Sequence, residues 1–466
     1  MSLAVTNLFD RRFWLCLAIF FAFNLISFLG FHVLIVQVVF FWLLVFLMIC
    51  LVIWRFDFAI LLFLGELLFG QAGHFLEWQN ISLRSALMII LLIGWLTRKI
   101  VKQEKILFFQ QSISVYWLVL ALMVLLAVGR GFWNNHESLL VIQDAMAYGF
   151  FLLVFPLSEF FRKESYWPWL TRILAVAVIG VSILTLANLF IYSAGLSQVH
   201  DNYYWWLRQI AVGKVTDLGS GFYRIVFPAH LWMLPLLLVL LSLVLGRNVS
   251  RGERKNLIIL AVAISLSLMI NFSRGYFLGI LAGLMLLKLN LSWRRWLIAF
   301  ILILLVFVVE FNLIYFLTTG KLAGLTFLSG RLGTITQPEE ELSSLTRLRI
   351  LPNLLFQIKQ NPIFGPGLGS MVSFLNPLNN LITKTSNPDW GWLEMWLELG
   401  LLGLMVYLAF SGKLIFSYLK GASRFSRDLS VGLAVGFVSL MVANLTGPFL
   451  FHPLGIFYQV LMISFI

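Results

Sequence analysis

The sequence has little charge and almost no cysteine. Only 11% of its 466 residues are charged, whereas soluble domains carry about 25%. Hydrophobic residues make up 61% of the chain and aromatic residues 16%. This balance excludes an ordinary soluble fold and predicts a polytopic membrane protein. The two cysteines, Cys16 and Cys50, lie in apolar runs without the spacing of a metal site, so neither a disulfide framework nor a zinc centre is expected.

Long polar segments are also scarce, and no linker, low-complexity tract or clear repeat divides the chain. We therefore expect a single all-α membrane domain over residues 1–466, with about 12–14 transmembrane helices. A membrane helix needs roughly 20 apolar residues, fewer in a short span. The runs that qualify are 13–29, 33–54, 56–70, 81–97, 113–130, 142–157, 173–193, 225–246, 257–272, 276–290, 296–318, 393–411, 429–447 and 453–466. The first run continues to about Trp54 without a small-residue cleavage site, which favours two retained helices over a signal peptide.

Acidic residues are fewer than basic ones, and the net charge is +13. The basic residues are spread over short connections, which is typical of membrane orientation rather than nucleic-acid binding. Their clusters all fall on one side of the membrane if the N-terminus is cytoplasmic: Arg11–Arg12, Arg98–Lys105, Arg162–Arg172, Arg247–Lys255, Lys288–Arg295 and Lys413–Arg427. Connections 130–141, 194–224 and 319–392 then face outward, away from the cytoplasm.

The segment 319–392 is the one long polar stretch, and we expect it to be a large outward loop that carries chemistry. Residues 343–361 have an amphipathic helical pattern in which Arg347 belongs to the apolar stripe, whereas Arg349 lies on the polar side. A cation on the buried face needs an anion. Pro352 should kink or restart this helix. Gly365, Gly367 and Gly369 then favour a tight turn, and the acidic run Glu339–Glu341 favours a solvated surface.

Three further polar residues lie near the outward ends of predicted spans. Arg274 in Ser273-Arg274-Gly275 is either an interfacial arginine that snorkels or a fixed cation for a lipid phosphate. Asp389 precedes a helix start, so it is either a cap or a general base. Arg224 ends the smaller outward loop, 194–224, whose Tyr203–Trp206 aromatics suit either the membrane interface or stacking on sugar rings.

Isolated polar residues inside or near the spans support an alternative function. His230, His452, Asp57 and Glu66 could each take part in the proton relay of a transporter. Their spacing shows no pairs. A transporter for lipid-linked glycans or small solutes, and a non-catalytic assembly subunit, therefore stand beside an enzyme as alternatives.

The order of these features resembles the O-antigen ligase and O-antigen polymerase superfamily of bacterial membrane glycosyltransferases. The resemblance rests on Ser273-Arg274-Gly275 at a span start, on Arg347 ahead of the turn Asn361–Gly367, and on Glu398-Leu399-Gly400-Leu401-Leu402-Gly403. Its specific part covers residues 273–403, and Arg224 ahead of Pro228 matches weakly. One departure is Asp389, which stands where ligases of this type usually have a His-Asn pair, so a polymerase or related transferase is favoured over a ligase.

The resemblance implies a type C glycosyltransferase-like fold in the bacterial inner membrane, with the active site facing the periplasm. It implies a donor glycan on undecaprenyl pyrophosphate and an acceptor hydroxyl on a glycan or lipid core, with inversion of the anomeric carbon and no metal or other cofactor. The membrane lipids are the other expected partners. The catalytic residues would be Arg274, Arg347 and Asp389. The substrate-binding residues would be Arg224, Arg349, Ser273 and Glu398.

Overall fold

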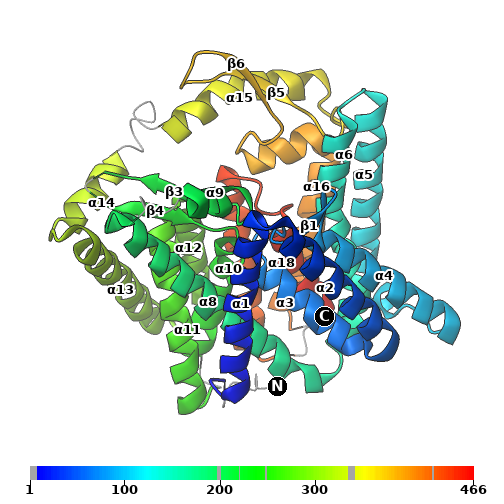
Figure 1. Cartoon of the computed structure of the whole chain (residues 1–466), viewed down its shortest axis with the longest axis horizontal. Coiled ribbons are helices and arrows are strands. Elements are labelled where there is room, and N and C mark those ends of the chain that lie inside the picture. Colours follow the sequence, from blue (N-terminus) through cyan, green and yellow to red (C-terminus); the bar gives the residue numbers. More distant parts are fainter. Residues whose placement is uncertain (1–7, 197–200, 220, 247–248, 334–341, 422–424) are drawn as a thin grey trace.

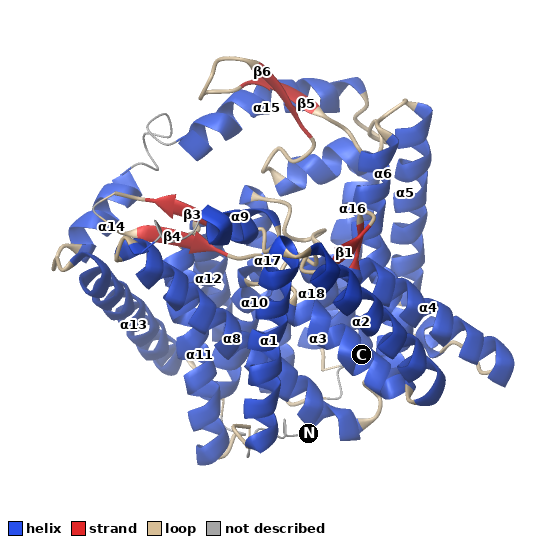
Figure 2. Cartoon of the chain, in the orientation of Figure 1, coloured by secondary structure: helices blue, strands red, loops and turns tan. Residues whose placement is uncertain are grey.

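The computed structural model describes residues 8–196, 201–219, 221–246, 249–333, 342–421 and 425–466. Helices dominate the described residues, and the strands form only short two-stranded ribbons (Figure 2). The helices are α1 (Arg11–His32), α2 (Leu34–Trp54), α3 (Phe56–Phe69), α4 (Leu83–Lys102), α5 (Ser114–Trp133), α6 (Ser138–Gly149), α7 (Val154–Phe160), α8 (Trp167–Ser193), α9 (Asp201–Gln209), α10 (His230–Leu245), α11 (Arg251–Asn271), α12 (Arg274–Leu286), α13 (Trp293–Thr319), α14 (Gly324–Gly333), α15 (Leu342–Gln360), α16 (Gly391–Leu419), α17 (Arg427–Ala443) and α18 (Pro453–Ser464). The predicted acidic surface at Glu339–Glu341 lies outside the described residues.

The expected all-α polytopic membrane architecture is confirmed. Eight helical segments among the described residues are long and apolar enough to cross a membrane: α1, α2, α5, α6 through α7, α8, α13, α16 and α17. The other predicted spans also coincide with helices, but α3, α10, α12 and α18 have fewer than 18 residues. Helices α4 and α11 are long enough but carry charged residues near their ends, at Arg84 and Lys102 in α4 and over Arg251–Lys255 in α11.

Both predicted outward loops lie at the same end of the helix bundle, opposite the start of α1 (Figure 1). The smaller loop contains α9 and the ribbon of β3 (Lys214–Asp217) with β4 (Tyr223–Val226), in which Lys214 pairs with Val226. The larger loop contains α14, α15 and the ribbon of β5 (Val372–Leu375) with β6 (Ile382–Thr385). A third ribbon joins β1 (Glu77–Trp78) to β2 (Ile81–Ser82).

The centre of the bundle is packed around α10 and α17. Nearly every residue of both helices is buried. Their backbones approach closely at Gly436, where an added Cβ would lie only 2.8 Å from the Pro235 carbonyl oxygen. In a membrane, small residues at helix contacts allow this approach and strengthen van der Waals packing. Helix α13, by contrast, exposes most of its apolar side chains, as expected for a helix that faces lipid.

The expected glycine turn is present, and it fits into a break in α16. Gly365, Gly367 and Gly369 all have positive φ, as does Gly400 inside α16. At that break, the amide groups of Leu401 and Leu402 donate to the carbonyl oxygens of Pro362 and Ile363 instead of to their own helix. A Cβ on Gly365 would lie 2.3 Å from the Leu397 carbonyl oxygen. The glycine turn and the segment Glu398–Gly403 therefore pack together as one unit. The sequence shows only that one follows the other along the chain.

Of the two effects expected at Pro352, a kink or a restart of the helix, the restart is absent. Helix α15 runs unbroken from Leu342 to Gln360 with Pro352 inside it. Proline removes one helical hydrogen bond, and the carbonyl group left over must find another partner. Pro352 faces outward on a helix at the surface of the protein, where water can supply that partner. The cost of the proline is thereby reduced, and the helix continues.

Candidate active site

Helix α15 is held across the outward end of the bundle by its apolar side. Ile350, Leu354 and Ile358 recur at a spacing of four residues and pack against β5 and Leu397 of α16. Arg347 lies one helical turn before Ile350, on the same inner side, and only 29% of its side chain is exposed. The placement of Arg347 on the buried side agrees with the amphipathic pattern. Its Nε is enclosed and has no hydrogen-bond partner among the described residues.

Asp389 lies beside Arg347. The Nη2 of Arg347 is 3.9 Å from the Oδ2 of Asp389, and the aspartate side chain is 53% exposed. The indole of the next residue, Trp390, donates to the carbonyl oxygen of Arg347 at 3.2 Å and so fastens this segment to α15. Helix α16 has Trp390 at its N-cap position, without a side-chain cap bond. Asp389 is therefore not the cap of this helix, and its carboxylate remains accessible.

The sharp connection between α11 and α12 positions Arg274. Phe272 ends α11 with a φ of +50°, which is an unfavourable conformation for a bulky residue. Ser273 is the N-cap position of α12, and Arg274 is its first residue. A Cβ on Gly275 would clash with Thr446, so only glycine lets α12 begin this close to the end of α17. The Nη1 of Arg274 donates to the Ser344 hydroxyl at 3.3 Å.

Ser344 connects the two predicted arginines in space. It lies three residues before Arg347 on α15, which corresponds to about 5 Å along a helix. Arg274 therefore reaches the same end of α15 as Arg347, although the two are far apart in the sequence. Arg349 is half-buried as well, and its Nη1 is enclosed without a hydrogen-bond partner within the described part of the chain. It comes two residues after Arg347, however, and therefore lies on a different side of α15. The guanidinium groups of Arg274 and Arg347 and the carboxylate of Asp389 thus gather at this end of α15.

Arg224 approaches from the ribbon of the smaller loop. Its Nε donates to the Asn271 carbonyl oxygen at 2.7 Å, so it caps the end of α11 three residues before Arg274. The side-chain amide of Asn271 is 2.7 Å from Nδ1 of His230. The Nε2 of the same ring is 3.0 Å from the Thr185 hydroxyl. With the amide donating to Nδ1, the imidazole is neutral with its proton on Nε2. A chain of hydrogen bonds then runs, donor to acceptor, from Arg224 through Asn271 and His230 to Thr185 on α8.

A buried group of carboxyl side chains lies behind Asp389. Glu398 is only 3% exposed, and its side chain is hydrogen-bonded to that of Asp144 on α6. Asp144 also accepts the amide of Gly369 at 2.9 Å. Glu394 is 6% exposed, lies near both Asp144 and Asp389, and its Oε2 has no hydrogen-bond partner among the described residues. Two bonded carboxyl groups must share a proton.

Glu398 is thus engaged with Asp144, and its expected part in substrate binding stays a prediction. Sequence reasoning missed Asp144 and gave Glu394 no role. The four-residue spacing of Glu394 and Glu398 indicates that they share one helix face. Nothing in the sequence connects them to Asp144, which lies about 250 residues earlier.

The aromatic residues of the smaller loop divide into two kinds. Trp206 is buried and donates to the Ser27 hydroxyl at 3.1 Å, and Tyr203 donates to Asn188 at 2.9 Å. Burial raises the pKa of the Tyr203 phenol, so it remains a donor. Tyr204 and Trp205, in contrast, are exposed. The first pair fastens α9 to the bundle, and the second pair is available to lipid or to a sugar.

The isolated polar residues in the spans have structural partners. Glu66 forms an ion pair with Arg84 at 3.0 Å, and Asp57 accepts the Tyr166 hydroxyl at 2.6 Å. His452 caps α18 by accepting the amide of Leu454. His230 belongs to the network beside Arg224. These contacts do not join the four residues into a path across the membrane.

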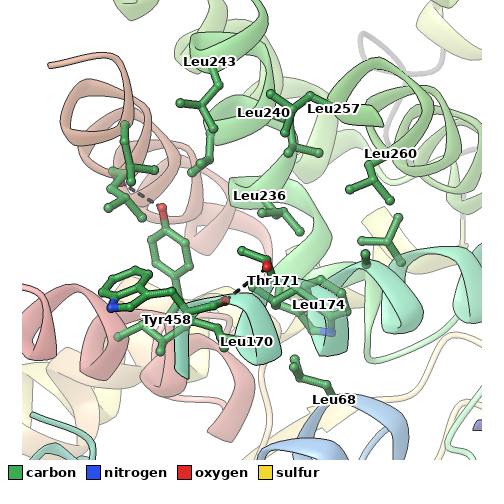
Figure 3. Close-up of a pocket in the computed structure, with 18 of the residues that line it drawn as sticks. Leu68, Leu170, Thr171, Leu174, Leu236, Leu240, Leu243, Leu257, Leu260 and Tyr458 are labelled. Carbon is green, nitrogen blue, oxygen red and sulfur yellow. Dashed lines mark hydrogen bonds between the residues drawn. The ribbon is translucent and has the colours of Figure 1, made fainter. Parts of the chain in front are cut away.

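Two cavities lie away from Arg274 and Arg347, and no arginine lines either of them. The cavity in Figure 3, of about 120 Å³, is lined almost entirely by apolar side chains such as Leu170, Leu236 and Leu260. None of its lining residues is charged, and along α10 it extends from Trp232 to Leu243. A polar pocket of about 340 Å³ lies at the far end of α15, between Gln357 and His136. No group of three or more His, Cys, Asp or Glu side chains within the described residues is arranged to hold a metal ion.

Comparison with known proteins finds a similarity to one family. Residues 259–408 match the model of the O-antigen ligase family, which is about a third of the chain. No curated protein sequence gives a significant match. A chain from a solved structure described as "Structural coordination of polymerization and crosslinking by a peptidoglycan synthase complex" is 19% identical, with a TM-score of 0.36. The similarity covers 74% of this chain and 97% of that one.

Proposed function

We propose that this protein transfers a glycan from undecaprenyl pyrophosphate to an acceptor hydroxyl during cell-surface polysaccharide assembly. The proposal starts from the match of residues 259–408 to the model of the O-antigen ligase family. The family match supports a membrane glycosyltransferase-type role in polysaccharide assembly. The donor, the acceptor, the inverting course and the independence from metal are our proposals. So is the location in the bacterial inner membrane with the site on the periplasmic side.

The observation that supports this function best is the meeting of Arg274, Arg347 and Asp389 at one end of α15. Arg274 contacts Ser344, and Arg347 lies 3.9 Å from Asp389. The three residues come from the start of α12, from α15 and from the segment before α16. All three lie within the stretch that matches the family. An arrangement of fixed cations beside an accessible carboxylate suits an anionic leaving group and a proton acceptor.

In the proposed reaction, Arg274 and Arg347 bind the pyrophosphate, with Arg224 and Arg349 in support. The Asp389 carboxylate takes the proton of the acceptor hydroxyl while that oxygen forms a bond to the anomeric carbon. The bond from this carbon to the pyrophosphate oxygen breaks, and its electron pair leaves with the pyrophosphate. Guanidinium groups stabilise the charge that grows there. A single displacement inverts the anomeric carbon.

Two residues with a left-handed backbone conformation, Phe272 and Asp389, lie at the proposed site. Phe272 precedes Ser273 and Arg274, and Asp389 itself has a φ of +57°. Residues in sparsely populated backbone regions cost about 1–3 kcal/mol each and persist where the surroundings enforce them. Aspartate tolerates this conformation better than most residues. The surrounding structure therefore fixes the backbone at Asp389 and just before Arg274, which suits a site whose groups are positioned in advance.

The test is transfer by the purified protein in detergent, with lipid-linked oligosaccharide from a producing strain and its acceptor. Release of undecaprenyl pyrophosphate together with elongated product is expected without a sealed membrane. The absence of release at every acceptor concentration would overturn the proposal. Product made with a second lipid-linked glycan as acceptor indicates a polymerase. Product made only with a lipid core indicates a ligase.

A transporter is the second candidate, and one observation favours it. Transporters bind substrates where helices are interrupted near buried polar groups. Helix α16 is interrupted at Gly400, beside the Asp144–Glu398 pair. However, the turn at Pro362 and Ile363 already satisfies the amide groups of this break. Uptake of lipid-linked glycan into sealed vesicles, without any release of pyrophosphate, would favour the transporter.

A further inference from the structure

A groove runs between α2 and α4 on the outer surface of the bundle. It encloses about 510 Å³, within the range of small-molecule sites. Ile49, Val52 and Ile53 of α2 form one wall. Ile90, Ile93, Gly94 and Thr97 of α4 form the other. The spacing of three and four residues places each set on one helix face.

At the floor of the groove, α2 and α4 are in close contact at a glycine, Gly94. A Cβ on Gly94 would lie 2.2 Å from Cγ1 of Val52, so any larger residue would push α4 away. The isoleucines on either side of this contact remain exposed, with Ile53 at 68% and Ile93 at 60%. In a membrane, such a face is covered by lipid tails or by another helix.

Two cations stand at one end of the groove. Arg98 and Lys102 both line it and lie four residues apart, so they are neighbours on the surface of α4. The guanidinium of Arg98 lies over the Phe56 ring at 4.9 Å, which fixes its position. Like charges at this spacing destabilise a helix unless an anion lies between them.

The acidic residues nearby form their ion pairs with a different lysine, although Glu104 also lies close enough to Arg98 and Lys102 to feel their charge. Lys99 forms ion pairs with Glu104 at 2.8 Å and with Glu159 at 2.9 Å. Neither Arg98 nor Lys102 has an ion pair with an acidic residue in the described part of the chain. With Lys105 nearby, this end of the groove therefore keeps a positive balance.

We propose that this groove binds one anionic diacyl phospholipid, with its tails along the isoleucine walls and its phosphate between Arg98 and Lys102. The distance from Ile90 to Lys102 is about 18 Å along a helix. Half of a hydrocarbon core about 30 Å thick is of the same order. The groove is therefore about as long as one leaflet of the membrane is thick. The basic end is the one that the distribution of positive charge assigns to the cytoplasm, so the lipid belongs to the cytoplasmic leaflet.

The proposal is tested by native mass spectrometry of the purified full chain in neutral detergent. Phosphatidylglycerol and phosphatidylcholine with identical tails are titrated separately. The wild type should bind the anionic lipid more tightly. The variant Arg98→Gln/Lys102→Gln should lose this preference. Its affinity for phosphatidylglycerol should be about thirtyfold lower, because each of the two cations near an anionic headgroup contributes a factor of about five.

Two controls make the outcome decisive. Lys413→Gln/Lys420→Gln removes the same charge from the end of α16 and should leave the lipid preference unchanged. Ile93→Trp fills the groove but keeps both cations, and it should weaken phosphatidylglycerol binding in the same way. An equal preference in wild type and the Arg98/Lys102 variant would overturn the proposal. Displacement of phosphatidylglycerol by inorganic phosphate alone, or by undecaprenyl phosphate at equal concentration, would also overturn it, because the occupant would not be a phospholipid.

Discussion

The guanidinium of Arg274 donates to the hydroxyl of Ser344, a residue 70 positions later in the chain. This contact joins the first turn of α12, in the bundle, to the first turns of α15, in the outward loop. It brings Arg274 to the end of the helix that carries Arg347 and, through Arg347, to Asp389. The proposed catalytic arrangement depends on this bridge between bundle and loop, and it can be disturbed from either side.

Replacing either bridging arginine by lysine should impair transfer. Lysine keeps the positive charge but cannot offer the paired donors of a guanidinium. We expect Arg274→Lys and Arg347→Lys each to lower kcat by a factor of about 100 to 1000, as for the loss of a donor to a developing anion. Initial rates of undecaprenyl pyrophosphate release measure the effect. Lys359→Gln, which changes a cation at the other end of α15, should retain activity. Unchanged rates in both arginine variants would contradict their proposed role.

Asp389→Asn should remove the proton acceptor without changing the shape of the side chain. General base catalysis contributes a factor of about 100 to 10,000, so we expect a fall in kcat within this range and little change in the KM for the donor. Steady-state kinetics at several donor concentrations separate the two constants. Asp217→Asn in the smaller loop is the matched control, because Asp217 is also an exposed outward aspartate. Wild-type turnover in Asp389→Asn would assign the base elsewhere.

Asn271→Ala should act through Arg224. The loss of the bond to His230 leaves a buried imidazole nitrogen with fewer partners, which costs about 1–3 kcal/mol of unfolding free energy. Displacement of the α11 end should also move Arg224 and lower kcat/KM by about 10-fold to 100-fold. Asn188→Ala removes a comparable buried amide that bonds Tyr203. It should lower stability alone. Equal kinetic losses in the two variants would indicate a general folding effect.

Arg84→Met should destabilise the protein strongly. Arg84 and Glu66 are both buried and lie 3.0 Å apart, and Arg84 also donates to the carbonyl oxygens of Leu67 and Gln71. Breaking a buried pair by removing one partner costs about 3–5 kcal/mol. Thermal unfolding in detergent measures the loss. The double variant Arg84→Met/Glu66→Leu should recover much of it, because no unpaired charge remains. A double variant no more stable than the single one would show that packing, not charge, dominates here.

Gly400→Ala should disturb the unit formed by α16 and the glycine turn. Gly400 has a φ of +72°, and an added Cβ would lie 2.2 Å from the Ile363 carbonyl oxygen. Either effect alone is destabilising. We expect a lower midpoint of thermal unfolding and faster proteolysis in the turn. Gly412→Ala in the same helix meets no neighbouring atom within 4 Å. It should therefore be neutral or slightly stabilising.

The sequence predicted the helices and the position of Arg347 because both depend on local patterns. Apolar runs fix where a chain can cross a membrane, and the stripe of α15 places Arg347 on its buried side. The distribution of basic residues also predicted that segments 194–224 and 319–392 share one side, and Figure 1 shows them at one end of the bundle. Helix propensity alone predicts a break at Pro352, but the proline is exposed, and α15 continues through it.

The remaining features depend on contacts between distant parts of the chain. Asp144 meets Glu398 only because α6 packs near α16. No local sequence pattern around either residue predicts this contact. The break at Gly400 has meaning only once the turn at Pro362 fills it. The ribbons of β3 with β4 and β5 with β6 are four residues per strand, too short to stand out from the loops around them.

The most direct test of the central claim is a structure of this protein with bound undecaprenyl pyrophosphate, solved in a lipid nanodisc. The account predicts that the pyrophosphate lies within hydrogen-bond distance of both Arg274 and Arg347, with Asp389 facing the same space. A pyrophosphate bound elsewhere, or one that contacts neither arginine, would contradict it.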